Sequence, residues 1–101
     1  MNDALGLLGL AKRANKIVYG DTLWQSLKQK KVKLIILAQD ASARTKKHIL
    51  SKSAYYKVPY LSICDSVELS RAIGKINIKA VGIVDIGIAN KLQEINRNEV
   101  G

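Results

Sequence analysis

Residues 33–38 read KLIILA, so that one lysine is followed by five apolar residues. A continuous apolar run of this length is typical of a strand that is buried on both faces, as in sheets covered by helices on both sides. Residues 80–84 read AVGIV and form a second run of the same kind. The two runs predict two central strands of a sheet covered by helices.

Shorter segments with strand or helix patterns surround these runs. Two further strands are predicted at residues 17–19 and 58–63, where Pro59 must lie at the start or on an edge because it has no N–H to donate. Five helices are predicted: 3–14, one starting at 20–22 with Asp21 or Thr22 as cap, 44–54 after a cap at 40–42, one capped by Asp65 or Ser66, and one carrying Ile88, Leu92 and Ile95. The order αβαβαβαβα predicts an α/β fold with a sheet between two helix layers.

Length and composition fit one domain that spans residues 1–101. The chain is 48% hydrophobic, which is enough for one core. Cys64 is its single cysteine, so no internal disulfide forms, as expected in a reducing compartment. No signal-peptide pattern is present, and no apolar run approaches the roughly 20 residues of a membrane span. We therefore expect a cytoplasmic protein without a membrane partner.

The charge is strongly positive and unevenly placed. The chain has 17 Lys and Arg residues against 8 Asp and Glu residues, and the first 57 residues hold all of the excess. Such a balance indicates a polyanionic partner, usually nucleic acid, with an anionic membrane surface and a merely soluble surface as the alternatives. Apart from Lys57, the basic residues of this part form three groups: Lys12, Arg13 and Lys16; Lys28, Lys30, Lys31 and Lys33; Arg44, Lys46, Lys47 and Lys52.

Some of these cations complement the negative ends of helices, and the others are available to phosphates. The predicted start of the second helix adds free backbone N–H groups near Gly20 to Leu23, which can donate to phosphates or base edges. Trp24 lies one turn further on and either stacks on a base or packs half-buried. These features favour a nucleic-acid interface around the second helix.

Catalytic and metal-binding groups are sparse. His48, the only histidine, follows two lysines, which indicates an exposed residue on a cationic face. No spacing pairs it with Cys64 as base and nucleophile, and no cluster of Cys or His offers a metal site. Asp40 and Asp85 follow apolar strands, where α/β folds often bind ligands, but helix capping is the simpler interpretation. We expect no catalytic residue, no metal and no cofactor.

Five segments in order resemble one known family. They are LLGLAKRANKIVYG (7–20), LIILAQDASARTKKHI (34–49), YYKVPY (55–60), ELSRAIGK (68–75) and AVGIVDIGIANKL (80–92). Together they are similar to the ribosomal-protein superfamily that includes large-subunit proteins seven-Ae and thirty-e, and specifically to its small bacterial YlxQ-like branch.

The resemblance implies a three-layer α/β/α sandwich with a four-stranded mixed sheet. It also implies non-enzymatic binding of structured RNA, either a kink-turn or a related internal loop, with ribosomal RNA as the expected partner and ribosomal or translation proteins as further candidates. The implied RNA-binding residues fall in three segments, and Arg13 and Lys16 join them as nearby cations: Gly20, Asp21, Thr22, Leu23 and Ser26; Asp40, Ser42 and Thr45; Gly74, Lys75, Ile76, Asn77 and Ile78.

The segment that opens the second helix departs from the family pattern. Kink-turn binders read roughly Gly-x-Asn-Glu-x-x-Lys there, whereas this chain keeps only Gly20 and has Thr22, Leu23 and Ser26 at the other three positions. The Asn and Glu of the family pattern read sheared purine pairs. The departure leaves open a second hypothesis, a translation-associated protein-interaction module whose RNA site has decayed.

Overall fold

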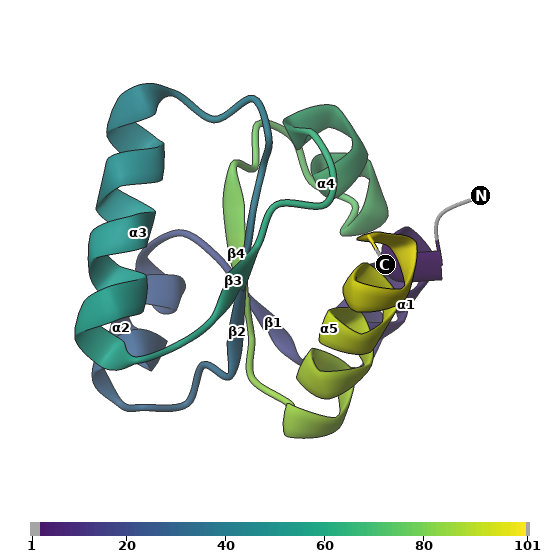
Figure 1. Cartoon of the computed structure of the whole chain (residues 1–101), viewed down its shortest axis with the longest axis horizontal. Coiled ribbons are helices and arrows are strands. Elements are labelled where there is room, and N and C mark those ends of the chain that lie inside the picture. The colour runs from purple at the N-terminus through teal and green to yellow at the C-terminus, as the bar shows by residue number, and fades with distance from the viewer. Residues whose placement is uncertain (1–2, 101) are drawn as a thin grey trace.

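The computed structural model describes residues 3–100, and the side chains of residues 3–97. It contains the five helices and four strands that the sequence predicts, in the same order (Figure 1). Their bounds are α1 Asp3–Arg13, β1 Ile17–Val18, α2 Asp21–Lys28, β2 Leu34–Leu37, α3 Ala43–Tyr56, β3 Tyr60–Leu61, α4 Ser66–Ala72, β4 Ala80–Ile83 and α5 Ile86–Val100.

The strands form one mixed sheet in the order β1-β4-β2-β3. The strand β4 runs antiparallel to both of its neighbours, with Ile17 opposite Ile83 and Ile35 opposite Gly82. The pairing of β2 with β3 is parallel, with Ile35 opposite Tyr60. The two long apolar runs are therefore the central strands, and the predicted four-stranded mixed sheet is confirmed.

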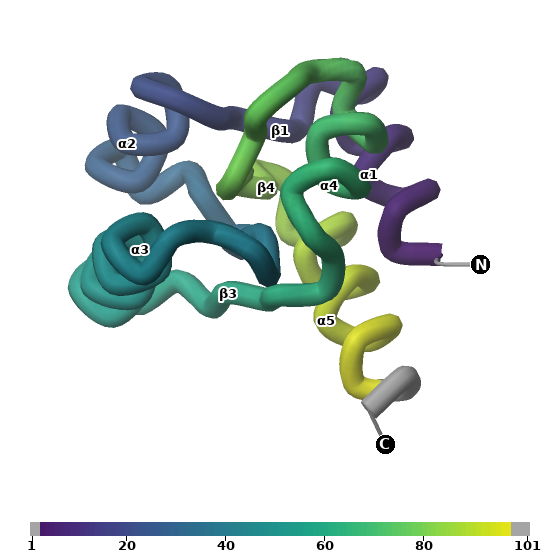
Figure 2. Tube along the Cα trace, turned by 90° about the horizontal axis from the view of Figure 1, so that it is seen from above, coloured from purple at the N-terminus to yellow at the C-terminus, as the bar shows by residue number. Residues whose placement is uncertain are grey.

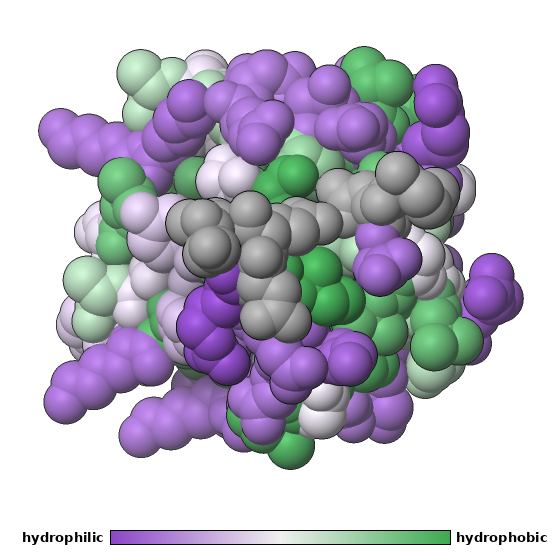
Figure 3. Space-filling view, turned by 45° about the vertical axis from the view of Figure 1, so that its right-hand side comes forward, coloured by the Kyte–Doolittle hydropathy of each residue, from purple (hydrophilic) through white to green (hydrophobic). Residues whose placement is uncertain are grey.

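Helices cover both faces of the sheet. Figure 1 shows α2 and α3 on one side and α1, α4 and α5 on the other, and Figure 2 shows the same separation from above. The three-layer sandwich is thus confirmed. Figure 3 turns the side of α1, α4 and α5 forward, and hydrophobic side chains are visible there between hydrophilic ones. None of the helices described is long and apolar enough to cross a membrane.

The two ends of β4 define two edges of the sheet that matter below. Here an edge means the side of the sheet where strands begin or end, and not an outermost strand. We call the side where β4 begins, and where β1, β2 and β3 end, the loop edge. The opposite edge, where β4 ends and the other three strands begin, is called the far edge. The assignment follows from the register, since Ala80 at the start of β4 pairs with Leu37 at the end of β2.

The helix α2 packs closely on the sheet at Gly82. All four residues of β2 are buried, and Leu23 and Leu27 of α2 are each 1% exposed. A Cβ atom at residue 82 would lie 2.7 Å from Cδ1 of Leu23 and 3.1 Å from side-chain carbons of Val18 and Val32. Because residue 82 has no side chain, α2 can rest directly on β4, and this contact sets the position of the β1–α2 junction.

The structure corrects some predicted boundaries. The strands β1 and β3 are two residues each, shorter than the predicted 17–19 and 58–63. Pro59 lies before β3 and uses only its carbonyl, which accepts a hydrogen bond from the Ile35 N–H at 2.9 Å. The predicted cap of α2 was wrong, because Gly20 is the N-cap and Asp21 already belongs to the helix. The cap predicted within 40–42 is Ser42, and of the two predicted caps of α4 it is Asp65 that forms the N-cap.

Among residues 3–100, four residues other than glycine have a left-handed backbone: Asn15, Lys30, Lys57 and Asn77, with φ between 57° and 63°. This conformation costs a residue with a Cβ atom roughly 1 kcal/mol, and Asn tolerates it better than Lys does. Lys57 ends α3 in this conformation, and Lys30 follows α2 in the same way. Two lysines thus occupy positions where glycine or asparagine would be usual.

Candidate nucleic-acid interface

The β1–α2 junction leaves the start of a helix open to a ligand. Gly20 has φ 62° and ψ −142°, and no side chain caps α2. The Leu23 N–H donates to the Gly20 carbonyl at 3.0 Å. Asp21 and Thr22 are exposed at the first turn. Uncapped N–H groups at a helix start, together with the helix dipole, favour an anion such as a phosphate.

The loop between α4 and β4 lies on the same edge and has a fixed shape. Ser70 of α4 holds it, because its hydroxyl accepts the Ile78 N–H at 2.9 Å and its carbonyl accepts the Lys75 N–H at 2.9 Å. Gly74 (φ 69°) and Asn77 (φ 57°) supply the left-handed turns. The loop therefore presents Lys75, Ile76 and Asn77 outward, and the Ile76 side chain is 83% exposed.

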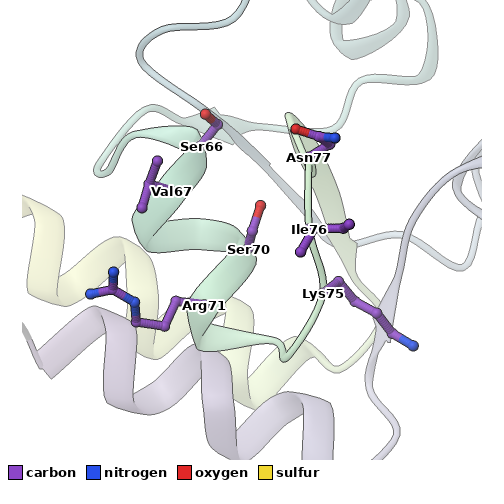
Figure 4. A pocket seen from close by; sticks show the side chains of 7 residues that line it. All are labelled: Ser66, Val67, Ser70, Arg71, Lys75, Ile76 and Asn77. Carbon is purple, nitrogen blue, oxygen red and sulfur yellow. The ribbon is translucent and has the colours of Figure 1, made fainter.

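Figure 4 shows these loop residues beside Ser66, Val67, Ser70 and Arg71 of α4. The two segments line a hollow of about 360 Å³. Arg71 lies on the helix side of this hollow and Lys75 on the loop side, and Figure 4 shows the charged ends of these two side chains pointing away from each other.

We expect Ser70→Ala to loosen this loop. The substitution leaves the partly buried Ile78 N–H without its acceptor, which should lower the free energy of unfolding by about 1–3 kcal/mol. Chemical denaturation measures the change, and hydrogen exchange at Ile78 should become faster. The control is Ser51→Ala at an exposed position of α3, which should change stability by less than about 0.5 kcal/mol. Equal effects of the two substitutions would contradict the anchoring role of Ser70.

A second hollow lies between the loop and the β1–α2 junction. Its volume is about 310 Å³, and Gly20, Thr45, Asn77 and Ile78 are among the residues that line it. The Lys75 ammonium lies 5.9 Å from the centre of the Tyr19 ring, within the range of a cation–π contact. This contact joins the loop to the junction, so that the two segments form one continuous surface.

Two aromatic rings form one wall of this hollow. Trp24 of α2 stacks on His48 of α3, with ring centres 4.7 Å apart and planes 7° apart. Trp24 is half-buried, as one of its two interpretations predicted, and His48 is exposed, as expected. His48 is thus engaged with an aromatic partner. Cys64 is buried, and this burial raises the pKa of its thiol to about 11, which disfavours the thiolate that a nucleophile needs.

The turn after β2 completes the surface. Ser42 caps α3 by accepting the Thr45 N–H at 3.1 Å. Asp40 accepts hydrogen bonds from the hydroxyl and the N–H of Ser66, both at 2.7 Å, and these bonds lower the pKa of its carboxyl group. The Lys79 ammonium donates to the same Ser66 hydroxyl at 3.2 Å. Asp40 thereby ties this turn to the start of α4.

The two strand-end aspartates do not form a site together. Asp85 accepts the Ile88 N–H at 2.9 Å and so caps α5, while Asp40 binds the first N–H of α4. Since β2 and β4 are antiparallel, Asp40 lies at the loop edge and Asp85 at the far edge. Helix capping, the simpler interpretation from the sequence, is confirmed for Asp85. Asp40 does not cap the helix that follows it, whose N-cap is Ser42, but binds the first residue of α4.

The structure brings most of the predicted RNA-binding residues to the loop edge, with four exceptions. Leu23 and Ser26 are 1% and 6% exposed, so their side chains support the junction from inside. Arg13 ends α1, and the Lys16 carbonyl accepts the Val84 N–H at 3.0 Å, beyond the end of β4. Both cations therefore lie toward the far edge, because β1 is antiparallel to β4.

Sequence reasoning missed Tyr19, Lys79 and Arg71. Tyr19 immediately precedes the predicted segment that begins at Gly20, and Lys79 immediately follows the one that ends at Ile78. Their position in the chain was therefore the available signal. Arg71 lies in the last turn of α4, shortly before the predicted segment 74–78, so its position in the chain was again the available signal.

A helix start without a side-chain cap, beside a loop that presents a lysine, favours an anionic ligand. Comparison with known proteins makes the class specific: the model of the ribosomal protein L7Ae/L30e/S12e/Gadd45 family matches residues 2–93. The chain belongs to this family.

Two relatives are bacterial proteins named RNA-binding protein YlxQ. That of Enterococcus faecium is 41% identical over 93 residues, covering 91% of this chain and 89% of the relative. That of Bacillus subtilis (strain 168) is 44% identical over 87 residues, covering 85% and 87%. The predicted resemblance to the YlxQ-like branch is confirmed.

Solved structures agree with the fold. A Bacillus halodurans protein of unknown function superposes with a TM-score of 0.88 at 34% identity, covering 94% of this chain and 97% of that one. The Giardia lamblia 15.5kD RNA binding protein superposes with a TM-score of 0.73 at 20% identity, covering 92% of this chain and 84% of that one.

Proposed function

We propose that this chain binds structured RNA, without catalysis, through its loop edge. The RNA-binding surface consists of Gly20–Thr22, Ser42–Thr45 and Lys75–Ile78, and the whole chain acts as one domain. The observation that carries the proposal is the uncapped start of α2, which lies beside a loop that presents Lys75 and is joined to it through Tyr19. Helix N–H groups and a lysine at one edge supply the contacts that phosphates require.

The family and the relatives support RNA as the partner. Two relatives with 41% and 44% identity are named RNA-binding proteins, and the matched family is one of ribosomal proteins. We infer that the RNA is internally looped, of the kink-turn type or related to it, and that ribosomal RNA is the natural target. The exposed Ile76 supports this, because an apolar side chain at a loop tip can pack on an unstacked base.

The altered junction indicates how the RNA is read. Leu23, which stands at the family's Glu position, is buried, and Thr22 stands at the Asn position with a short exposed side chain. Few side-chain groups therefore remain at the junction to distinguish base edges. We infer that this chain recognises the RNA mainly by its shape and its phosphates, through the N–H groups of α2 and the cations of the loop.

We expect Lys75→Ala to weaken binding of a compact internal-loop hairpin. Loss of one phosphate contact should reduce the slope of log affinity against log salt by about 0.7–0.9. Filter binding of a ribosomal RNA hairpin at several salt concentrations measures both affinity and slope. Arg13→Ala is the matched control, because it removes one exposed cation that lies away from the loop edge.

The outcomes separate the two functional hypotheses. Loss of affinity in Lys75→Ala but not in Arg13→Ala supports RNA binding at the loop edge. An affinity that does not depend on salt, or equal effects of both substitutions, would exclude this surface. Partners that persist after thorough nuclease treatment would instead favour the translation-associated protein-interaction module, which the altered junction motivates.

A further inference from the structure

The far edge carries a second basic surface, which we call the lysine hollow. Lys30, Lys33 and Lys57 border a hollow of about 320 Å³. The Lys33 N–H donates to the Ile83 carbonyl at 2.7 Å, and the Ile35 N–H donates to the Pro59 carbonyl at 2.9 Å. Lys33 is therefore fixed between the end of β4 and the start of β3, at the opposite end of the sheet from the proposed RNA-binding surface.

No described carboxylate forms an ion pair with any of the three lysines. Within residues 3–97, the ion pair formed is Lys91–Glu94 on α5, at 3.6 Å. Lys30, Lys33 and Lys57 are all exposed. Three exposed cations around one hollow, with no carboxylate paired to any of them, give a local positive potential that attracts a polyanion.

Backbone conformation sets two of these lysines apart from the residues at other helix ends. Lys30 and Lys57 are left-handed, with φ 61° and 57°. At comparable helix ends, the chain uses Asn15 after α1 and Gly74 after α4, which tolerate this conformation well. Compensation of the helix dipole does not explain Lys30, since Lys28 and Lys31 already lie at the end of α2. The last turn of α3 holds no basic residue, so Lys57 also complements the dipole of that helix.

An exposed aromatic ring lies next to the lysine hollow. Tyr56 lines the hollow, and the Tyr55 ring packs edge-on against it at 4.8 Å and 87°. The Tyr55 side chain is nevertheless 77% exposed. Cations that track a backbone, combined with an exposed aromatic ring that can stack on a base, are the two devices by which proteins bind single-stranded RNA.

We infer that the lysine hollow is a second RNA contact, which binds an unpaired strand that extends from the structured RNA held at the loop edge. The phosphates of this strand lie against Lys30, Lys33 and Lys57, and one base stacks on Tyr55. The inference rests on the proposed function, and the two surfaces lie at opposite edges of a molecule whose extents are 32, 29 and 27 Å. A single RNA that contacts both would wrap around the protein.

Two RNA probes and two charge-matched variants test this inference. The probes are an internal-loop hairpin alone and the same hairpin with a single-stranded extension long enough to cross the molecule. The test variant is Lys33→Gln/Lys57→Gln, in which glutamine leaves the left-handed position at residue 57 as costly as before. The control is Lys91→Gln/Arg97→Gln on α5, which removes the same number of charges from exposed positions outside both surfaces.

For the unchanged protein we expect the extension to raise affinity about tenfold or more, because the second contact is intramolecular. The Lys33→Gln/Lys57→Gln variant should lose this gain and keep its affinity for the hairpin alone. Tyr55→Leu should lose about fivefold on the extended probe, and ultraviolet crosslinking should join Tyr55 to the extension. The Lys91→Gln/Arg97→Gln control should bind both probes like the unchanged protein.

The outcomes distinguish failure of this inference from failure of the proposed function. A hairpin that binds, with an extension that adds no affinity, overturns the second contact and leaves the loop edge intact. Equal losses of affinity in the test variant and the control would show that only the net charge of the protein matters, and would also overturn the second contact. If neither probe binds, RNA binding itself fails. Vesicles of anionic lipid that compete with the extended probe would assign the hollow to a lipid surface instead.

Discussion

Gly20→Ala is expected to reduce both stability and RNA affinity. The backbone of Gly20, at φ 62° and ψ −142°, lies close to a region that only glycine occupies readily. A Cβ atom there would meet nothing within 4 Å, so the effect comes from the backbone and not from a clash. We expect the free energy of unfolding to fall by about 1–3 kcal/mol, as measured by chemical denaturation.

The effect on RNA follows from the same strain. If the chain relieves it by rotating the peptide, the N–H groups at the start of α2 turn away from the ligand. Loss of one hydrogen bond to a phosphate should weaken binding of the hairpin by about tenfold, as measured by filter binding. Such a loss should also persist in conditions under which the variant is fully folded.

Gly6→Ala provides the control for Gly20→Ala. Gly6 also has open space around the added atom, but it lies inside α1 with an ordinary helical backbone. Alanine there should stabilise the protein by about 0.5–1 kcal/mol and leave RNA affinity unchanged. A Gly20→Ala protein as stable as the Gly6→Ala protein, with full affinity, would show that the junction does not need glycine.

Gly82→Ala is expected to be the second strongly destabilising change. The added atom would lie 2.7 Å from Cδ1 of Leu23, in a contact where α2, β1 and the segment before β2 also meet. Overpacking of this kind should lower the free energy of unfolding by about 1–3 kcal/mol, as measured by denaturant or thermal unfolding. It should also push α2 outward and thereby disturb the RNA-binding surface.

A double variant identifies the cause of the Gly82→Ala effect. Leu23→Ala alone should lower the free energy of unfolding by about 2–5 kcal/mol. The double variant Leu23→Ala/Gly82→Ala should lose clearly less than the sum of the two single losses. Gly9→Ala serves as the milder comparison, since its Cβ atom would lie 3.3 Å from the Ala72 carbonyl oxygen. Fully additive costs at residues 23 and 82 would argue against a direct clash.

The element order was predictable from the sequence because its signals are local. The apolar runs at 33–38 and 80–84 are long enough to identify buried strands, and Ser42 and Asp65 are ordinary helix caps. The cap of α2 was not predictable, since the sequence offers Asp21 and Thr22 as better caps than Gly20. Only the three-dimensional turn after β1, with its positive φ, selects the glycine.

The candidate site was predicted less completely, because it depends on strand direction. Lys75 belongs to a predicted site segment and Arg13 was added to the site as a nearby cation, and nothing local in the sequence shows that only one of them lies at this surface. The antiparallel position of β4 between β1 and β2 places Lys75 at the loop edge and Arg13 toward the far edge. The burial of Leu23 and Ser26 likewise follows from the close approach of α2 to Gly82, a contact between distant parts of the chain.

The hydrogen bonds from Ser66 to Asp40 hold the start of α4 in place, and mild acid should not disrupt them. Because the pKa of Asp40 lies below its ordinary value of 3.8, its bonds to Ser66 favour the folded state above that value. This contribution fades only as the pH falls through the still lower folded-state pKa. The helix that anchors the loop of Lys75 should therefore stay docked throughout the range in which histidines titrate, and should loosen only in strong acid.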